Sequence, residues 1–134
     1  MISASTKVKV RFAETDAMGI VYHANYLPWC ECSRHALLES IGVKYNDLVA
    51  LGFHLPVVEA HLNYKYPAKF GDEVEIKVKI TERPSVKIKI EYELYVGERL
   101  IVTGHTVHVF INLEGQPVKP PRDFLNVLRQ AFDK

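Results

Sequence analysis

Long apolar runs are missing from this chain, and so is a secretory signal. No uninterrupted apolar stretch approaches the ~20 residues that a membrane-spanning helix needs. The first residues, Met1–Lys7, lack the apolar core of a secretory signal peptide. We therefore expect no membrane insertion, and the cytoplasm is the expected location.

Cysteine is scarce as well. Cys30 and Cys32 stand two apart in a helical pattern, so their side chains point to different sides and suit a disulfide poorly. We expect both to be packing residues. His105 and His108, three apart on an expected strand, project to opposite faces, and no zinc-type Cys/His spacing occurs. We therefore expect no metal and no redox cofactor.

Other signatures are also absent. The chain has neither the G-x-S-x-G elbow of serine hydrolases nor the P-loop of nucleotide hydrolases. A formal net charge of +1 gives no global reason to expect nucleic acid as a partner. With 134 residues and no Gly/Ser-rich or Pro-rich linker, the chain is expected to form a single domain, residues 1–134.

The apolar pattern changes period along the chain. Alternating residues predict strands over 7–12, 55–66, 74–80, 86–92 and 100–112, and helical spacing predicts helices over 25–41, 46–51 and 124–131. Asn25 is a plausible cap of the long helix, and Glu31 with Arg34 is most simply an ion pair along it. Clustered strands without intervening helices predict an α+β fold, in which a curved antiparallel sheet wraps around one long helix.

The most informative stretch is Val10–Tyr26. It passes from a strand-like segment through an acidic turn with a glycine into the long helix. This order can place the Asp16 carboxylate beside the N–H groups of a helix start, where one group activates or attacks and the other stabilises an oxyanion. The alternative is an ordinary turn aspartate.

This stretch resembles the opening motif of hotdog-fold acyl-CoA thioesterases of the 4-hydroxybenzoyl-CoA thioesterase type. The matching positions run from Arg11 and Phe12 through Glu14-Thr15-Asp16 and Gly19 to Asn25-Tyr26. Downstream matches are Glu31 with Arg34, the stretch from Tyr64 to Asp72, and Pro120. The nearest subgroup resembles the thioesterases associated with the bacterial Tol-Pal system. The resemblance covers nearly the whole chain.

The resemblance implies a function and roles. Asp16 maps onto the catalytic carboxylate, as base or nucleophile, and the His23 backbone N–H maps onto the group that polarises the thioester carbonyl. A catalytic His23 side chain is the alternative. Other hotdog enzymes use a glutamate as the base, but Glu59 lies in an expected strand, where we expect it to face solvent. The family works as dimers with joined sheets, often paired into tetramers, and its substrate is an acyl- or aroyl-CoA.

Substrate-binding candidates fall into two groups. Around the motif they are Gly19, Tyr22, Asn25 and Tyr26, for which turn-forming, capping or core roles are the alternatives. Downstream, Lys65 and the group Arg83, Ser85 and Lys87 offer cationic and hydroxyl donors to coenzyme phosphates.

Two other functions compete with a thioesterase. One is a hotdog dehydratase acting on a hydroxyacyl thioester, although the Thr15-Asp16-x-x-Gly19 turn does not match that class. The other is a non-catalytic protein that binds acyl thioesters or an acyl carrier protein. Chain length, aromatic preference and the choice between coenzyme A and a carrier protein stay open.

Overall fold

The computed structural model describes all residues, 1–134. Its helices are α1 (Tyr26–Ser40), α2 (Tyr45–Ala50) and α3 (Arg122–Asp133), with single 3-10 turns at Phe12–Glu14 and His23–Asn25. Its strands are β1 (Ile2–Lys9), β2 (Phe53–His54), β3 (Val57–Tyr64), β4 (Glu73–Ile80), β5 (Lys87–Val96), β6 (Arg99–Val109) and β7 (Ile111–Asn112). None of the helices is both long enough and apolar enough to span a membrane.

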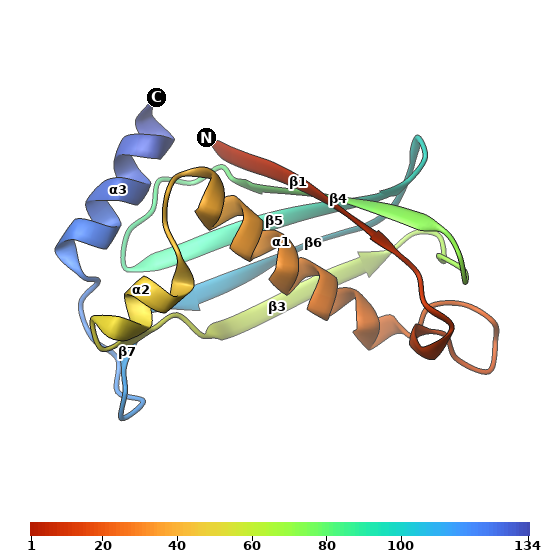
Figure 1. The fold of residues 1–134 in the computed structure, drawn as a ribbon, viewed down its shortest axis with the longest axis horizontal. Coiled ribbons are helices and arrows are strands. Elements are labelled where there is room, and N and C mark those ends of the chain that lie inside the picture. The colour runs from red at the N-terminus through yellow and green to blue at the C-terminus, as the bar shows by residue number, and fades with distance from the viewer.

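Five strands form one antiparallel sheet in the order β1-β4-β5-β6-β3, while β2 pairs separately with β7. The long helix α1 crosses one face of the sheet, and α2 and α3 lie beyond one end of it (Figure 1). This is the expected α+β architecture, an antiparallel sheet with one long helix on its face.

Sequence alternation explains the two faces of the sheet. In β4 and β5 the apolar residues point to α1 and are buried, whereas the intervening Lys and Glu residues face outward. On α1 the buried positions include Cys30, Ser33 and Leu37, which recur with helical spacing on one side of the helix. The small side chains of Cys30 and Ser33 let the helix lie close to the sheet. The buried side chains of sheet and helix form a single hydrophobic core.

Several expected strand boundaries are wrong. The strand expected over 86–92 continues to Val96, and the one expected over 100–112 ends at Val109, before the separate strand β7. The first strand begins at Ile2 and ends at Lys9, because the Val10 N–H donates to the Asp72 carbonyl at 2.9 Å and the chain then turns at Phe12–Glu14. The strand expected over 55–66 is shorter in the structure, where β3 spans Val57–Tyr64. Pro56 has no N–H to donate to a ladder, so β3 begins after it, and the short strand β2 that pairs with β7 lies before it.

The strand β3 lies at the edge of the sheet and is exposed on both faces, apart from the half-buried Leu62. Opposite Leu62 on β6 stands Gly104. A Cβ atom at position 104 would overlap the His61 carbonyl oxygen and the Leu62 side chain, so the two strands approach closely there.

Candidate functional site

The Asp16 turn is held by its own backbone and by its side chain. The Asp16 N–H donates to the Ile20 carbonyl at 2.9 Å, and the Gly19 N–H donates to the Asp16 carbonyl at 3.0 Å. The Asp16 Oδ1 accepts the Met18 N–H at 2.8 Å. Gly19 has φ +79°, a left-handed conformation that glycine adopts without strain. Asp16 thus does serve as a turn residue, but through one oxygen only.

Glu14 fixes this turn to the helix. Its buried carboxylate accepts the Arg11 N–H and the Trp29 Nε1–H, each at 2.8 Å. Burial alone raises the pKa of Glu14, but these two hydrogen bonds and the Arg11 guanidinium together bring the pKa below its usual value. Glu14 therefore remains a charged anchor between the strand end and α1, a role that its position in the motif did not reveal.

The Glu14 carbonyl oxygen binds the other side of the loop. It accepts the Tyr22 N–H at 2.9 Å and the Asn25 side-chain amide at 2.8 Å. Asn25 occupies the N-cap position of α1, as expected, but its side chain makes no capping bond to the helix. Its amide instead ties the helix start to the acidic turn.

The helix start leaves donors free. His23 and Ala24 open the 3-10 turn that leads into α1, and neither donates its N–H to a turn or loop carbonyl. The Tyr64 hydroxyl donates to the His23 carbonyl at 2.9 Å and so holds this turn against β3. The His23 ring packs between the rings of Tyr22 and Tyr64.

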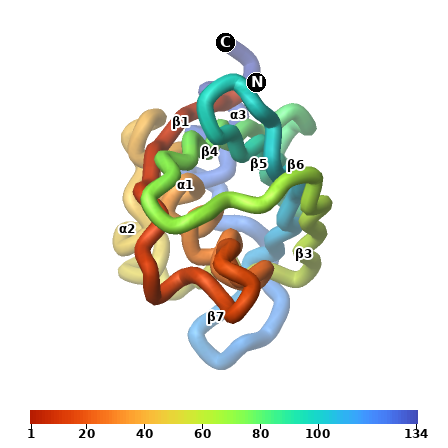
Figure 2. The backbone as a smooth tube through the Cα atoms, turned by 90° about the vertical axis from the view of Figure 1, so that its right-hand side faces the viewer, coloured from red at the N-terminus to blue at the C-terminus, as the bar shows by residue number.

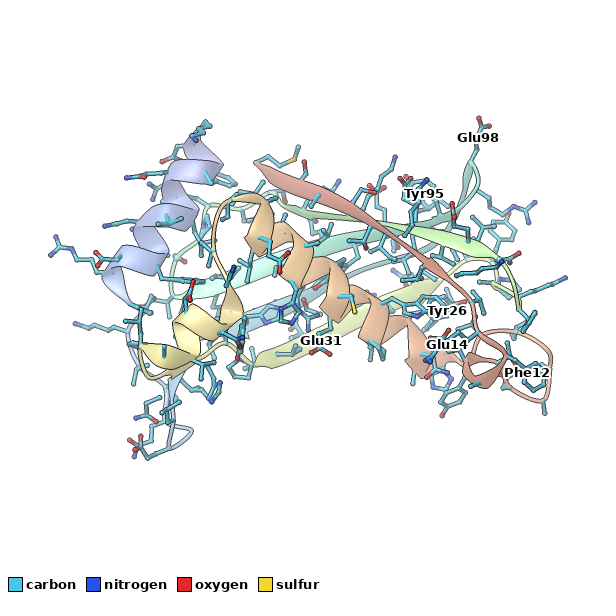
Figure 3. The ribbon with its side chains drawn as sticks, in the orientation of Figure 1. Phe12, Glu14, Tyr26, Glu31, Tyr95 and Glu98 are labelled. Atoms are coloured by element: carbon cyan, nitrogen blue, oxygen red, sulfur yellow. The ribbon has the colours of Figure 1, made fainter.

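A cavity of about 260 Å³ joins these elements. Asp16 and His23 both line it, together with Tyr26, Tyr64 and Lys65. Figure 2 looks onto this end of the molecule, where the loop that follows β1 lies beside the segment between β3 and β4. Figure 3 shows Glu14 and Tyr26 near the point where α1 begins. An anionic side chain and a helix N-terminus therefore share one cavity wall.

Not every candidate lines this cavity. Gly19, Tyr22 and Asn25 shape the turn and the helix start around it, and Tyr26 is buried with its hydroxyl accepting the Ala68 N–H at 3.3 Å. Tyr26 therefore contributes both to the core and to the cavity.

Arg83, Ser85 and Lys87 lie elsewhere. They belong to the segment between β4 and β5 or to the start of β5, at the end of the sheet beside α3 and far from the Asp16 loop (Figure 1). Arg83 donates to both carboxylate oxygens of Asp133, at 3.3 and 3.1 Å. Within one chain the structure does not bring this group together with Asp16.

Other residue expectations had mixed outcomes. Glu31 and Arg34 do not pair: Glu31 approaches His35 at 3.9 Å, and Arg34 donates to the Tyr92 hydroxyl at 3.1 Å. Glu59 is exposed as expected, and its carboxylate contacts His105 at 3.0 Å.

The two cysteines differ. Cys30 is fully buried, and burial raises the pKa of its thiol to about 12, which fits a packing residue. Cys32 is exposed, so its expected packing role is wrong, because the helix turns that side away from the sheet. No three His, Cys, Asp or Glu side chains gather in a way that could hold a metal ion.

The sequence matches a known protein family. The family model of the thioesterase-like superfamily aligns with residues 10–128. The chain belongs to this superfamily. A relative in Bacillus subtilis, named "Putative acyl-CoA thioesterase YneP", is 37% identical over 110 residues, which cover 81% of this chain and 79% of that protein.

Solved structures of the thioesterase-like superfamily extend the comparison. A 1,4-dihydroxy-2-naphthoyl-CoA thioesterase from Staphylococcus aureus is 29% identical, with TM-score 0.90, covering 99% of this chain and 90% of that one. A 4-hydroxybenzoyl-CoA thioesterase variant complexed with 4-hydroxybenzoyl-CoA is 17% identical, with TM-score 0.84 and coverage of 96% and 99%, and it shows the fold alone. The family match and the named relatives confirm the expected superfamily and the expected class of thioester hydrolases. The structural matches confirm the expected hotdog fold.

Proposed function

We propose that this protein hydrolyses an acyl- or aroyl-CoA thioester to the free acid and coenzyme A. The observation that carries the proposal is the shared cavity of Asp16 and the helix start, where the His23 N–H is free to donate. The relatives named above, an acyl-CoA thioesterase and a naphthoyl-CoA thioesterase, support coenzyme A thioesters as the substrate class.

In the proposed mechanism, Asp16 and the His23 N–H have separate roles. The His23 N–H, in the 3-10 turn directly before the N-terminus of α1, stabilises the negative charge that develops on the thioester oxygen. The Asp16 oxygen that does not hold the turn takes a proton from a water molecule, whose oxygen attacks the carbonyl carbon. The C–S bond then breaks, and Asp16 returns the proton to the departing coenzyme A sulfur. In the alternative route Asp16 attacks directly, and water hydrolyses the resulting mixed anhydride.

We assign substrate contacts near this cavity first. Lys65 and Tyr26 line it, and Lys65 supplies a cation for the coenzyme. Gly19, Tyr22 and Asn25 shape the turn and the helix start beside it. Arg83, Ser85 and Lys87 stay predicted coenzyme contacts, and their position at the far end of the sheet requires that they act on the site of another subunit.

A homo-oligomer, at least a dimer and by resemblance a tetramer, is part of the proposal. The cavity of about 260 Å³ is smaller than the ~300–1,000 Å³ typical of ligand sites. Tyr64 and Lys65, which line it, stand at the end of the exposed edge strand β3. A second copy pairing along β3 would both cover that edge and enlarge the site.

Several expectations stay predictions. They are the absence of a metal or redox cofactor, the cytoplasmic location, acyl carrier protein as a possible substrate carrier, and the Tol-Pal-associated subgroup. The absence of nucleic-acid partners is another.

The direct test is Asp16→Asn. The asparagine oxygen can still accept the Met18 N–H, so the turn survives while the charge disappears. We expect a fall in kcat of at least ~100-fold, read as free thiol released from a panel of acyl- and aroyl-CoA substrates. Unchanged melting temperature and oligomer size are the control, and near-wild-type thiol release would overturn the assignment.

Adding an enoyl thioester to the panel, and measuring binding as well as thiol release, separates the thioesterase from the dehydratase and the non-catalytic protein. Hydration of an enoyl thioester without thiol release would favour the dehydratase. Saturable binding of every thioester without hydrolysis would favour the non-catalytic protein.

A further inference from the structure

A second and larger cavity lies along the other half of α1. Its volume is about 440 Å³, within the range typical of small-molecule sites, and it shares no lining residue with the Asp16 cavity. Its apolar walls come from the sheet, from α1, from the segment before β3 and from α3: Leu38, Leu55, Ile80, Ile88, Ile90 and Leu128. The polar lining residues are few, and Glu31, labelled halfway along α1 in Figure 3, marks the rim.

A chain of hydrogen bonds runs through the core beside this cavity. His108 Nδ1 lies 3.2 Å from the Leu55 carbonyl, and His108 Nε2 lies 2.8 Å from Thr106 Oγ1. Thr106 Oγ1 lies 2.7 Å from the Tyr92 hydroxyl, which accepts Arg34 Nη1–H at 3.1 Å. Three of these contacts do not reveal by distance alone which atom donates.

Chemistry fixes the direction of the chain. The Leu55 carbonyl can only accept, so His108 carries its proton on Nδ1 and its Nε2 must accept. Burial lowers the pKa of His108 to about 4, and the Arg34 charge acts the same way, so the ring is neutral at pH 7. Thr106 then donates to His108 and Tyr92 donates to Thr106. The sequence of donors therefore begins at Arg34.

The Arg34 guanidinium has no anionic partner, and most of its N–H donors are unused. It has five N–H groups, only one of which is used in this chain, and no carboxylate lies within ion-pair distance of it. Glu31 lines the same cavity, but its side chain is 62% exposed and its carboxylate is directed to His35. A half-buried guanidinium beside apolar walls favours a ligand that brings its own anion.

We propose that this cavity binds an apolar carboxylic acid, with Arg34 holding the carboxylate and the Leu and Ile side chains enclosing the apolar body. Two sources supply this chemistry: the free acid that a thioesterase releases, or the distal carboxylate of a dicarboxylic acyl thioester. Binding of the free acid is independent of the proposed function, whereas the second source rests on it.

Calorimetry with octanoate and with its uncharged analogue octanamide tests the site. We expect wild type to bind octanoate at least ~10-fold more tightly than octanamide, because only octanoate pairs with the guanidinium. Arg34→Gln should remove this preference, whereas Arg122→Gln, which removes an exposed arginine at the start of α3, should leave it intact. No octanoate binding, equal binding of the two ligands, or a preference that survives Arg34→Gln would overturn the proposal.

A second variant covers the case in which Arg34→Gln disturbs folding. Leu38→Phe fills part of the cavity without touching the hydrogen-bond chain, and it should weaken octanoate at least ~5-fold. The matched control is Leu27→Phe, an exposed position on the same helix. Equal octanoate affinity in Leu38→Phe and wild type would place the ligand elsewhere and overturn the proposal.

Kinetics then distinguishes the two sources. If the substrate carries the carboxylate, Arg34→Gln should raise KM for suberyl-CoA and leave KM for octanoyl-CoA unchanged. If the cavity holds the released acid, the variant should relieve inhibition by octanoate instead. A variant that changes neither would overturn both assignments. Failure of wild type to hydrolyse any thioester would count against the proposed function alone, because the calorimetric result does not depend on turnover.

Discussion

The carboxylates of Glu14 and Asp16, which stand two residues apart, have different roles. Glu14 is buried and all but enclosed by donors, so its charge serves the structure. Asp16 uses one oxygen to hold the turn, and its other oxygen is free beside a cavity. The motif made Asp16 a candidate from sequence, but the role of Glu14 depends on its contact with Trp29, fifteen residues away, which no local pattern encodes.

At this scale we predict that Glu14→Gln lowers the free energy of unfolding by about 1–3 kcal/mol at pH 7, because a neutral amide is a weaker acceptor for Arg11 and Trp29. Denaturant unfolding measures the loss. The exposed Glu73→Gln, which removes only a surface ion pair with Lys7, is the control and should cost much less.

The pH dependence gives this prediction a sign. The pKa of Glu14 in the folded protein is lower than its usual value of 4.5, so its charge stabilises the fold above that pH. The difference between wild type and Glu14→Gln should therefore shrink as the pH falls through the folded pKa. A difference that stays constant down to that pH would contradict the proposed anchor.

At the scale of elements, periodicity was a good guide to type and a poorer guide to limits. The long helix was expected over 25–41 and spans Tyr26–Ser40, because its apolar positions recur with helical spacing. The strand expected over 7–12 ends at Lys9, the last residue of β1 that pairs with β4. The alternation of charged and apolar side chains continues in the sequence beyond that point. A pattern of side chains does not show where a neighbouring strand stops.

The turn between β1 and α1 offers an element-level prediction. Gly19→Ala places a Cβ on a residue with φ +79°, which costs about 1 kcal/mol and shifts the Asp16 turn. Gly115→Ala is a matched control, since Gly115 has φ +85° in a turn near β7. We expect similar losses of stability in both, with kcat/KM reduced only in Gly19→Ala. Equal activity in the two variants would separate the turn from catalysis.

At the scale of the whole molecule, the two halves of α1 serve different cavities, and its start also depends on the edge strand through Tyr64. The sequence predicted a single sheet around this helix but not the partners of Arg34 or Arg83. Glu31 stood three residues from Arg34, yet Tyr92 was brought to it from another element. Such contacts depend on how elements pack, which spacing within one element does not record.

Oligomerisation belongs to this scale too. Val58 is a 56% exposed apolar residue on β3, and Val86 is a 62% exposed valine before β5. If copies pair along β3, Val58→Asp buries a charge in the interface, so it should dissociate the oligomer and lower thioesterase activity. Val86→Asp should do neither. Light scattering and the thiol assay measure both effects, and an intact oligomer in Val58→Asp would locate the interface elsewhere.

Gly104 imposes a limit that its backbone angles do not reveal. Its φ lies outside the left-handed region, so torsion alone would admit any amino acid, yet the carbonyl of His61 occupies the place where a first side-chain carbon would stand. The constraint is one of room rather than of rotation. Even the smallest addition at this point would push the outermost strand away from its neighbour, and would thereby change the outline of the border that a second copy has to meet.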